Sequence, residues 1–173
     1  MELIKEITIH APPTKYVQKL KRPKFDSKGK LVTENVHYLT SNLFFNNNLS
    51  YFITNKIIDW CKDFLYPYFK GLPALEKANL VIEYYKPTDI DLDNVCFFYH
   101  KLIMDILKTP TPKQLISASK KSKNIITTNT IKDDDTKVSN VIHWEFFYGE
   151  PKMVVKIYGR VKDEQVKMEF FFK

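Results

Sequence analysis

The order of apolar and polar positions divides the first half of the chain into segments of strand and helix period. Residues 3–9 (LIKEITI) alternate apolar and charged positions, the two-residue period of a strand with one buried face. From Ser50, apolar residues recur at steps of three and four, which predicts an amphipathic helix that ends near Pro67–Gly71. Residues 78–86 (ANLVIEYYK) predict a second strand.

The second half predicts one buried helix and a run of strands. Residues 95–108 are mostly apolar and form a helix that Asn94 caps. Further strands are predicted from Val138, over 153–161 and over 165–173. The predicted order is strand, helix, strand, helix and then several strands. This order is typical of a single α+β domain, here with a mixed sheet and two main helices packed on it.

Two segments lack a convincing core period and are predicted to be loops, at 11–48 and 109–130. Both are basic in a chain whose 27 Lys and Arg outnumber its 20 Asp and Glu, for a net charge of +7. Such an excess favours a polyanion partner, although Lys-rich surfaces can also serve solubility alone. The candidate contacts to a nucleic-acid backbone are Lys15, Lys19, Lys21, Arg22 and Lys24, with Lys120, Lys121 and Lys123 as a second group.

Composition removes several classes of protein. With 4 Gly there is no glycine-rich phosphate loop, so no nucleotide cofactor is expected. Cys61 and Cys96 each lie in an apolar segment, so a disulfide framework is not expected. The four His residues are scattered along the chain and do not suggest a zinc site. The N-terminus reads as neither a signal peptide nor an anchor, and no apolar run approaches the ~18 residues of a membrane span. We expect a cytoplasmic protein without a membrane partner.

An acidic stretch at 88–94 (TDIDLDN) directly follows the second predicted strand. Asp89, Asp91 and Asp93 alternate with apolar or polar neighbours, so at least two carboxylates share one face of an extended chain. A solvated acidic loop is one interpretation. A calcium loop is excluded, because its sixth and twelfth positions are Asn94 and His100 instead of Gly and Glu. A magnesium site for phosphodiester chemistry is the third interpretation, since hard divalent cations bind carboxylate oxygens.

A second acidic cluster could complete such a site. Asp133, Asp134 and Asp135 precede the strand predicted from Val138. In a mixed sheet that strand can lie beside the strand at 78–86 and bring its end close to the first cluster. The sequence alone does not show this adjacency.

These residues resemble a known family, the RusA-type Holliday-junction resolvases. The likeness rests on D-L-D-N at 91–94, followed by an apolar helix with Lys and D-x-L, and on D-D-x-x-V at 134–138, which opens a strand. The N-terminal strand followed by APPTKY also resembles that family. It spans roughly residues 3 to 160. The resemblance implies that Asp91, Asp93 and Asp135 hold the catalytic metal, with Asp134 as a secondary ligand.

The lysine of the family's motif has no direct counterpart. That position, four residues after the second aspartate, holds Phe97 in this chain. Lys101 is the nearest candidate and keeps the D-x-L spacing to Asp105. The four extra residues could add one helical turn or form a loop before the helix. A simple surface pair between Lys101 and Asp105 is the alternative role.

The function that the resemblance implies is a magnesium-dependent endonuclease that resolves four-way DNA junctions by paired cuts. Mn²⁺ would substitute for Mg²⁺, and the products would carry 5′-phosphate and 3′-hydroxyl ends. Family members are homodimers, so a two-fold dimer is expected, and the source would be a bacterium or a virus infecting one. The alternatives are a catalytically silent DNA-binding protein of the same fold and an unrelated module that binds RNA or another polyanion.

Overall fold

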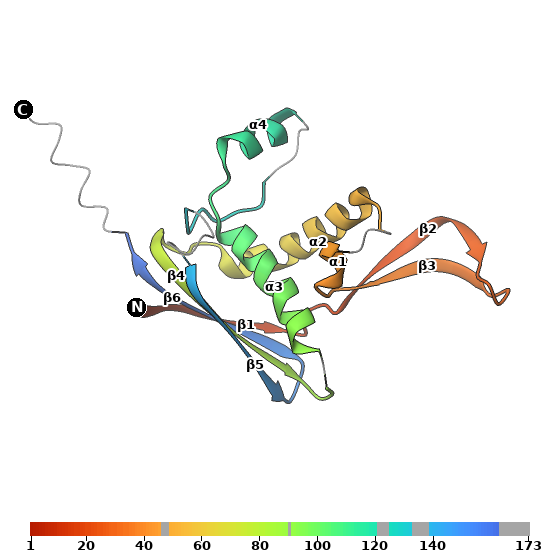
Figure 1. The fold of residues 1–173 in the computed structure, drawn as a ribbon, viewed down its shortest axis with the longest axis horizontal. Helices are drawn as coiled ribbons and strands as arrows, with labels where there is room; N and C mark the ends of the chain where they lie inside the picture. The colour runs from red at the N-terminus through yellow and green to blue at the C-terminus, as the bar shows by residue number, and fades with distance from the viewer. Residues whose placement is uncertain (46–48, 90, 121–124, 133–138, 163–173) are drawn as a thin grey trace, which may run out of the picture.

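The computed structural model describes residues 1–45, 49–89, 91–120, 125–132 and 139–162 (Figure 1). Six strands and four helices lie in these ranges. In chain order they are β1 (Glu2–His10), β2 (Lys15–Phe25), β3 (Leu31–Tyr38), α1 (Asn42–Phe45), α2 (Tyr51–Phe69), β4 (Leu75–Lys86), α3 (Leu92–Leu107), α4 (Pro112–Lys120), β5 (Ser139–Tyr148) and β6 (Lys152–Val161). The strand predicted over 165–173 lies outside the described residues.

Four strands form the main sheet, in the order β1-β6-β4-β5. β4 runs parallel to β5 and antiparallel to β6, and β1 runs antiparallel to β6. The predicted α+β class with a mixed sheet is therefore confirmed. β5, the strand that follows the second acidic cluster, does lie beside β4, but its start pairs with Ala78 and therefore lies at the end of β4 away from the first cluster.

The core lies between this sheet and the two long helices, α2 and α3, which cover one face (Figure 1). Side chains alternate along β4, so Ile82 and Tyr84 face the helices, and the ring centroid of Tyr84 lies 6.3 Å from that of Tyr99 on α3. Gly159 on β6 is required for close packing, since a Cβ there would lie 2.9 Å from the carbonyl oxygen of Lys77.

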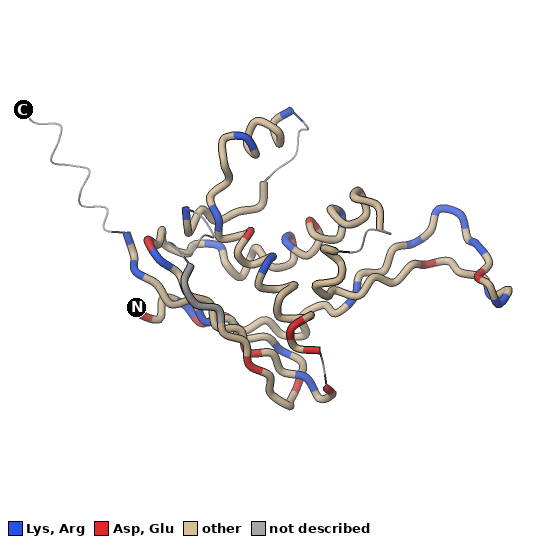
Figure 2. The backbone as a smooth tube through the Cα atoms, in the orientation of Figure 1, with Lys and Arg blue, Asp and Glu red and all other residues tan. Residues whose placement is uncertain are grey.

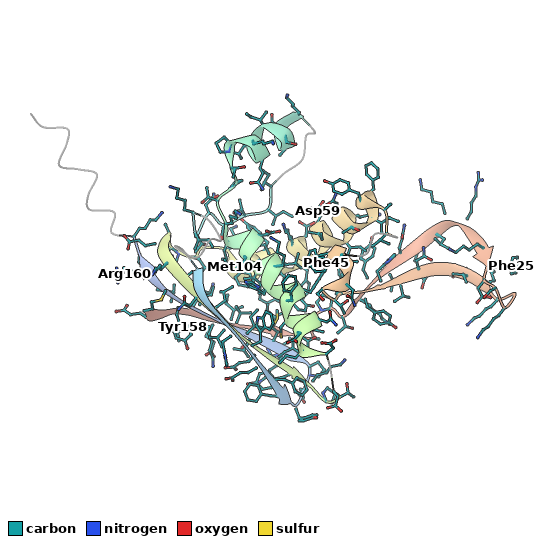
Figure 3. The ribbon with its side chains drawn as sticks, in the orientation of Figure 1. Phe25, Phe45, Asp59, Met104, Tyr158 and Arg160 are labelled. Carbon is teal, nitrogen blue, oxygen red and sulfur yellow. The ribbon has the colours of Figure 1, made fainter. Side chains whose placement is uncertain are left out.

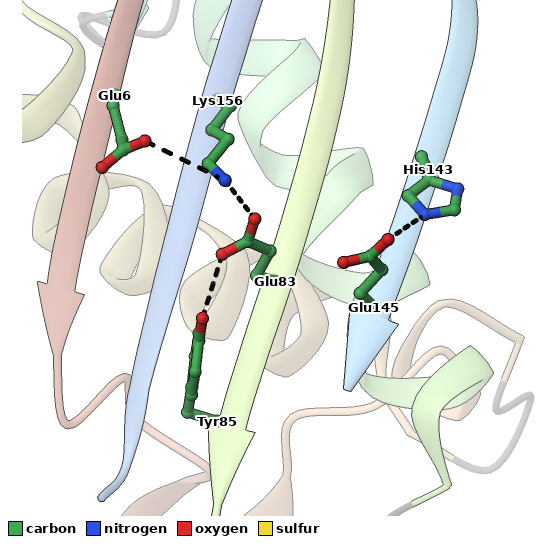
Figure 4. Close-up of polar contacts among 6 residues, drawn as sticks. All are labelled: Glu6, Glu83, Tyr85, His143, Glu145 and Lys156. Atoms are coloured by element: carbon green, nitrogen blue, oxygen red, sulfur yellow. Dashed lines mark hydrogen bonds and ion pairs between the residues drawn. The ribbon is translucent and has the colours of Figure 1, made fainter. Parts of the chain in front are cut away.

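The opposite face of the sheet carries polar and charged side chains (Figure 4). Lys156 on β6 donates a hydrogen bond to Glu83 on β4, and Glu6 on β1 lies 4.0 Å from the same ammonium. Tyr85 donates to the other oxygen of Glu83 at 3.1 Å. The hydrogen bond to Glu83 raises the pKa of Lys156.

The prediction of a basic loop at 11–48 is wrong, because β2 and β3 pair there as an antiparallel hairpin that projects from the body (Figure 1). Only its base packs, through Tyr16, whose ring centroid lies 5.3 Å from that of Trp60 on α2. Both faces of the outer part are exposed, so the strands do not show the alternation that a half-buried strand gives.

The turn of this hairpin is held by local hydrogen bonds. The Asp26 carboxylate accepts the backbone N–H groups of Lys28 and Lys30 at 2.8 and 2.9 Å. Gly29 adopts a φ of 74°, which favours glycine. The sequence D-S-K-G at 26–29 thus encodes the turn.

The prediction of a loop over 109–130 also needs correction, because α4 lies within it. Thr111 and Gln114 form a capping box: the Thr111 N–H donates to the Gln114 side chain at 2.8 Å, and the Gln114 N–H donates to the Thr111 hydroxyl at 3.3 Å. Pro112 takes the first helical position, where its missing N–H costs nothing.

No helix in the described part of the chain has the length and apolar character needed to cross a membrane.

Candidate functional site

Asp91 and Asp93 lie at the N-terminus of α3, just after the end of β4. The predicted cap, Asn94, is inside the helix, and Asp91 is the N-cap instead. Its carboxylate accepts the backbone N–H of Asn94 at 3.3 Å. Asp93 lies in the first turn, where the helix dipole favours a negative charge. The two carboxylates of the D-L-D-N motif are thus brought together, and both residues are exposed.

A cleft of about 540 Å³ opens in front of these carboxylates. α3 forms one wall and the segment after β3 forms another. The lining residues are Ser41, Phe45, Asp91, Asp93, Asn94, Phe97 and Trp144. Figure 2 shows acidic residues at the start of α3 and several basic residues along the hairpin.

A chain of hydrogen bonds fixes Asp91 within this cleft. The Asn94 amide donates to the second carboxylate oxygen of Asp91, and the Ser41 hydroxyl donates to the amide oxygen of Asn94. The backbone N–H of Ser41 also donates to the carbonyl oxygen of Asn94 at 2.8 Å. The segment that returns from the hairpin is therefore tied to the start of α3. Sequence reasoning missed this role of Ser41, because only the fold brings it to the motif.

A smaller cavity of about 220 Å³ adjoins the cleft and shares Asp91 and Asn94 with it. Lys86, the last residue of β4, lines this cavity, as does Asp89. The Tyr148 hydroxyl donates to Asp89, and this hydrogen bond raises the pKa of Tyr148. Lys86 is a cation near the motif that the sequence analysis did not single out, although its place directly before the acidic stretch was a usable signal.

Lys101 lies farther along α3. All residues from Asp93 to Lys101 are helical, so no loop separates the two residues. Eight residues correspond to about 12 Å along the axis. The Lys101 ammonium lies 3.4 Å from the Asp105 carboxylate, which Lys62 also contacts at 2.9 Å. Phe97, at the position where the resemblance leads one to expect a lysine, lines the cleft.

The third predicted ligand cannot be placed, because Asp134 and Asp135 lie outside the described residues. The described start of β5, Ser139, pairs with Ala78, whereas Tyr148 pairs with Lys86. Because the two strands are parallel, β5 begins at the end of the sheet opposite to Asp91. Within the described ranges, no three His, Cys, Asp or Glu side chains gather into a group that could hold a metal ion.

The predicted DNA contacts are arranged on two projecting elements. Lys15, Lys19, Lys21, Arg22 and Lys24 all lie on β2 and are exposed. Lys120 is the last residue of α4 and is exposed too, while Lys121 and Lys123 lie outside the described residues. The first group thus lies on a strand of the hairpin rather than in a loose loop.

The chain matches no family model, no curated protein and no solved structure. The resemblance to the RusA-type resolvases therefore rests on the sequence motifs alone.

Proposed function

We propose that the chain is a magnesium-dependent endonuclease that cuts branched DNA, with four-way junctions as the expected substrate. One observation carries this proposal: the segment that leaves the basic hairpin forms a wall of the cleft that Asp91 and Asp93 line. A phosphate backbone gripped by the hairpin would be led toward two carboxylates. A basic surface beside an acidic cleft is the arrangement that metal-dependent cleavage of a polyanion requires.

The donor set suits Mg²⁺. This ion is usually held by one or two carboxylates and keeps several waters, and both Asp91 and Asp93 are exposed to the cleft. When bound, Mg²⁺ supplies activated water and stabilises charge on the phosphate. Asn94 orients the Asp91 carboxylate, so one ligand is fixed before the metal arrives. The resemblance implies Asp135 and Asp134 as further ligands, but β5, which follows them, begins at the end of the sheet opposite to Asp91, so the proposal rests on Asp91 and Asp93.

The positive charge near the reacting phosphate has two candidate sources, Lys101 and Lys86. Lys101 is paired with Asp105, and Lys86 lines the cavity that includes Asp91. We expect Lys86→Met to lower the rate of cleavage at saturating DNA by at least about tenfold, and Lys101→Met to change it less. A larger loss of cleavage rate in Lys101→Met than in Lys86→Met would support the catalytic role that the resemblance implies for Lys101.

A catalytically silent DNA-binding protein is the second candidate. It is favoured by Phe97 at the lysine position and by the pairing of Lys101 away from the cleft. Such a protein would bind a junction with the same affinity whether or not Mg²⁺ is present, and would leave it intact.

Strand cleavage of a labelled four-way junction separates the two candidates. The wild-type protein is incubated with junction, linear duplex and single strand, each with Mg²⁺, with Mn²⁺ and with chelator. The endonuclease predicts paired cuts on the junction alone, lost in chelator. Tight binding without any cut under either metal would support the silent protein, and equal affinity for junction, duplex and RNA would support a general polyanion module.

A further inference from the structure

The outer end of the β2–β3 hairpin carries two large apolar side chains that are exposed. Phe25, the last residue of β2, pairs with Leu31, the first residue of β3, so both side chains lie on the same face of the hairpin. They are 71% and 51% exposed. Figure 3 shows Phe25 at the outer end of the hairpin, away from the sheet and its helices. This tip pair, Phe25 and Leu31, therefore adds nothing to the hydrophobic core.

Positive charge surrounds the tip pair. Residues 15–38 contain seven basic residues and two acidic ones. Lys24 directly precedes Phe25 on β2, so its side chain points to the opposite face, and Lys28 and Lys30 follow in the turn. The hairpin thus ends in an apolar face that has cations next to it.

This combination fits the stacked bases of DNA and not its phosphates alone. A two-stranded ribbon fits the major groove, and Phe and Leu are among the side chains that proteins insert between base steps. An inserted side chain has a phosphate strand on each side, so cations beside it are favourable, whereas a charge on the inserted group itself would lose its hydration. We propose that Phe25, supported by Leu31, inserts between neighbouring bases of the bound DNA and kinks it there.

The insertion gives the hairpin a means to prefer branched DNA over linear duplex. Unstacking costs least where bases are already unpaired, as they are at a branch that has opened. The strand β2 has 11 residues, so the tip pair lies at most about 36 Å from the base of the hairpin, where the wall of the carboxylate cleft begins. One turn of DNA is about 34 Å long, so the inserted ring meets bases within about one turn of the phosphate in the cleft.

An anionic lipid surface is the other partner that cations and apolar side chains would fit. It is disfavoured here because the turn beyond the tip pair contains Asp26, Lys28 and Lys30, which would enter the bilayer ahead of the pair.

This inference rests on the proposed function for its partner, DNA, but not for catalysis, so it is tested in chelator. A four-way junction carries 2-aminopurine, whose fluorescence rises when it loses its stacking, at successive positions within one turn of the branch. The wild type should raise the fluorescence at one or two adjacent positions. Phe25→Ala should abolish this rise and increase the Kd for the junction by about tenfold, while Phe25→Trp should keep the rise. Phe52→Ala, which removes an exposed ring from α2, should change neither.

Two readouts distinguish insertion from a purely structural role of Phe25 in the hairpin. Phe25→Val keeps a strand-forming residue but is too short to insert, so it should behave like Phe25→Ala. The slope of log affinity against log salt concentration should not change in either variant, because no cation is lost, whereas Lys24→Ala should lower it by about 1. A lower slope in Phe25→Ala, or wild-type behaviour of Phe25→Val, would overturn the proposal.

The same samples separate this proposal from the nuclease proposal. A wild type that binds the junction without any change in fluorescence overturns the insertion, even if it cuts in Mg²⁺. Unstacked bases without cleavage in Mg²⁺ support the insertion and count against the nuclease. Vesicles of phosphatidylserine and phosphatidylcholine test the lipid alternative. If they bind the wild type but not Phe25→Ala, while both proteins bind the junction equally, the tip pair faces a membrane and the insertion is overturned.

Discussion

Asp91 is an N-cap and a proposed metal ligand, and one pair of substitutions can separate these two roles. Its carboxylate caps α3 by accepting the Asn94 N–H, and it is a proposed metal ligand. Asn is as good an N-cap as Asp but a poor ligand for Mg²⁺, whereas Ala can do neither. Asp91→Asn should therefore keep most of the stability and lose cleavage, while Asp91→Ala should lose both.

The size of the effect follows from the cap. Loss of an N-cap side chain costs about 1 kcal/mol, within a range of about 0.5 to 2. For a chain of 173 residues this lowers the melting temperature by about 2–4 °C per kcal/mol. Cleavage by either variant should fall by more than about 100-fold, beyond the loss expected for an outer contact of a metal site.

The assay is thermal unfolding followed by circular dichroism in chelator, together with junction cleavage in Mg²⁺. Chelator is needed because bound metal would itself stabilise the wild type. If Asp91→Asn melts as low as Asp91→Ala, the carboxylate does not act as a cap that an amide can replace. If Asp91→Asn cuts like the wild type, Asp91 is not a ligand.

Three further predictions concern the hairpin, the sheet and the buried thiols. Lys21→Ala on β2 should weaken junction binding and lower the slope of log affinity against log salt concentration by about 1, while turnover at saturating DNA stays the same. An unchanged slope in a binding titration would show that Lys21 does not contact the DNA backbone. Gly159→Ala should lower the free energy of unfolding, measured in urea, by about 1–3 kcal/mol, because the new Cβ would meet the Lys77 carbonyl oxygen. An unchanged free energy of unfolding would mean that β4 and β6 can move apart at low cost. Burial raises the pKa of Cys61 and Cys96 from 9.0 to about 12, so the thiols lose their protons at lower pH in the unfolded chain than in the folded one. The urea midpoint of unfolding should therefore fall as the pH rises from about 9 toward 12. A midpoint that rises over this window would contradict the burial argument.

Segments with a strong period were predictable from sequence because burial on one side enforces that period. This holds for β1, α2 and β4, whose apolar side chains fill the core. The hairpin and α4 escaped the same reasoning because neither buries a face against its own chain. Their local signals, the D-S-K-G turn at 26–29 and the capping box from Thr111 to Gln114, are encoded by hydrogen bonds and not by hydrophobic pattern.

The candidate site was predictable only as far as it is local. Asp91 and Asp93 are two positions apart in sequence, so their shared place near the start of one helix could be inferred. Ser41 reaches Asn94 across 53 positions, and no pattern in the chain announces that contact. The sequence allowed β4 and β5 to be neighbours without showing it, and the parallel register, which sets Ser139 at the far end of the strand from Asp91, could not be read from sequence.

The most direct test of the account compares Asp93→Asn with a matched variant, Glu76→Gln, which removes one exposed carboxylate from β4. Binding to a labelled four-way junction and its cleavage in Mg²⁺ are measured on the same preparations. The account predicts that both variants bind like the wild type, that Glu76→Gln cuts at the wild-type rate, and that Asp93→Asn does not cut. Cleavage by Asp93→Asn at the wild-type rate would contradict the assignment of the carboxylate cleft as the metal site.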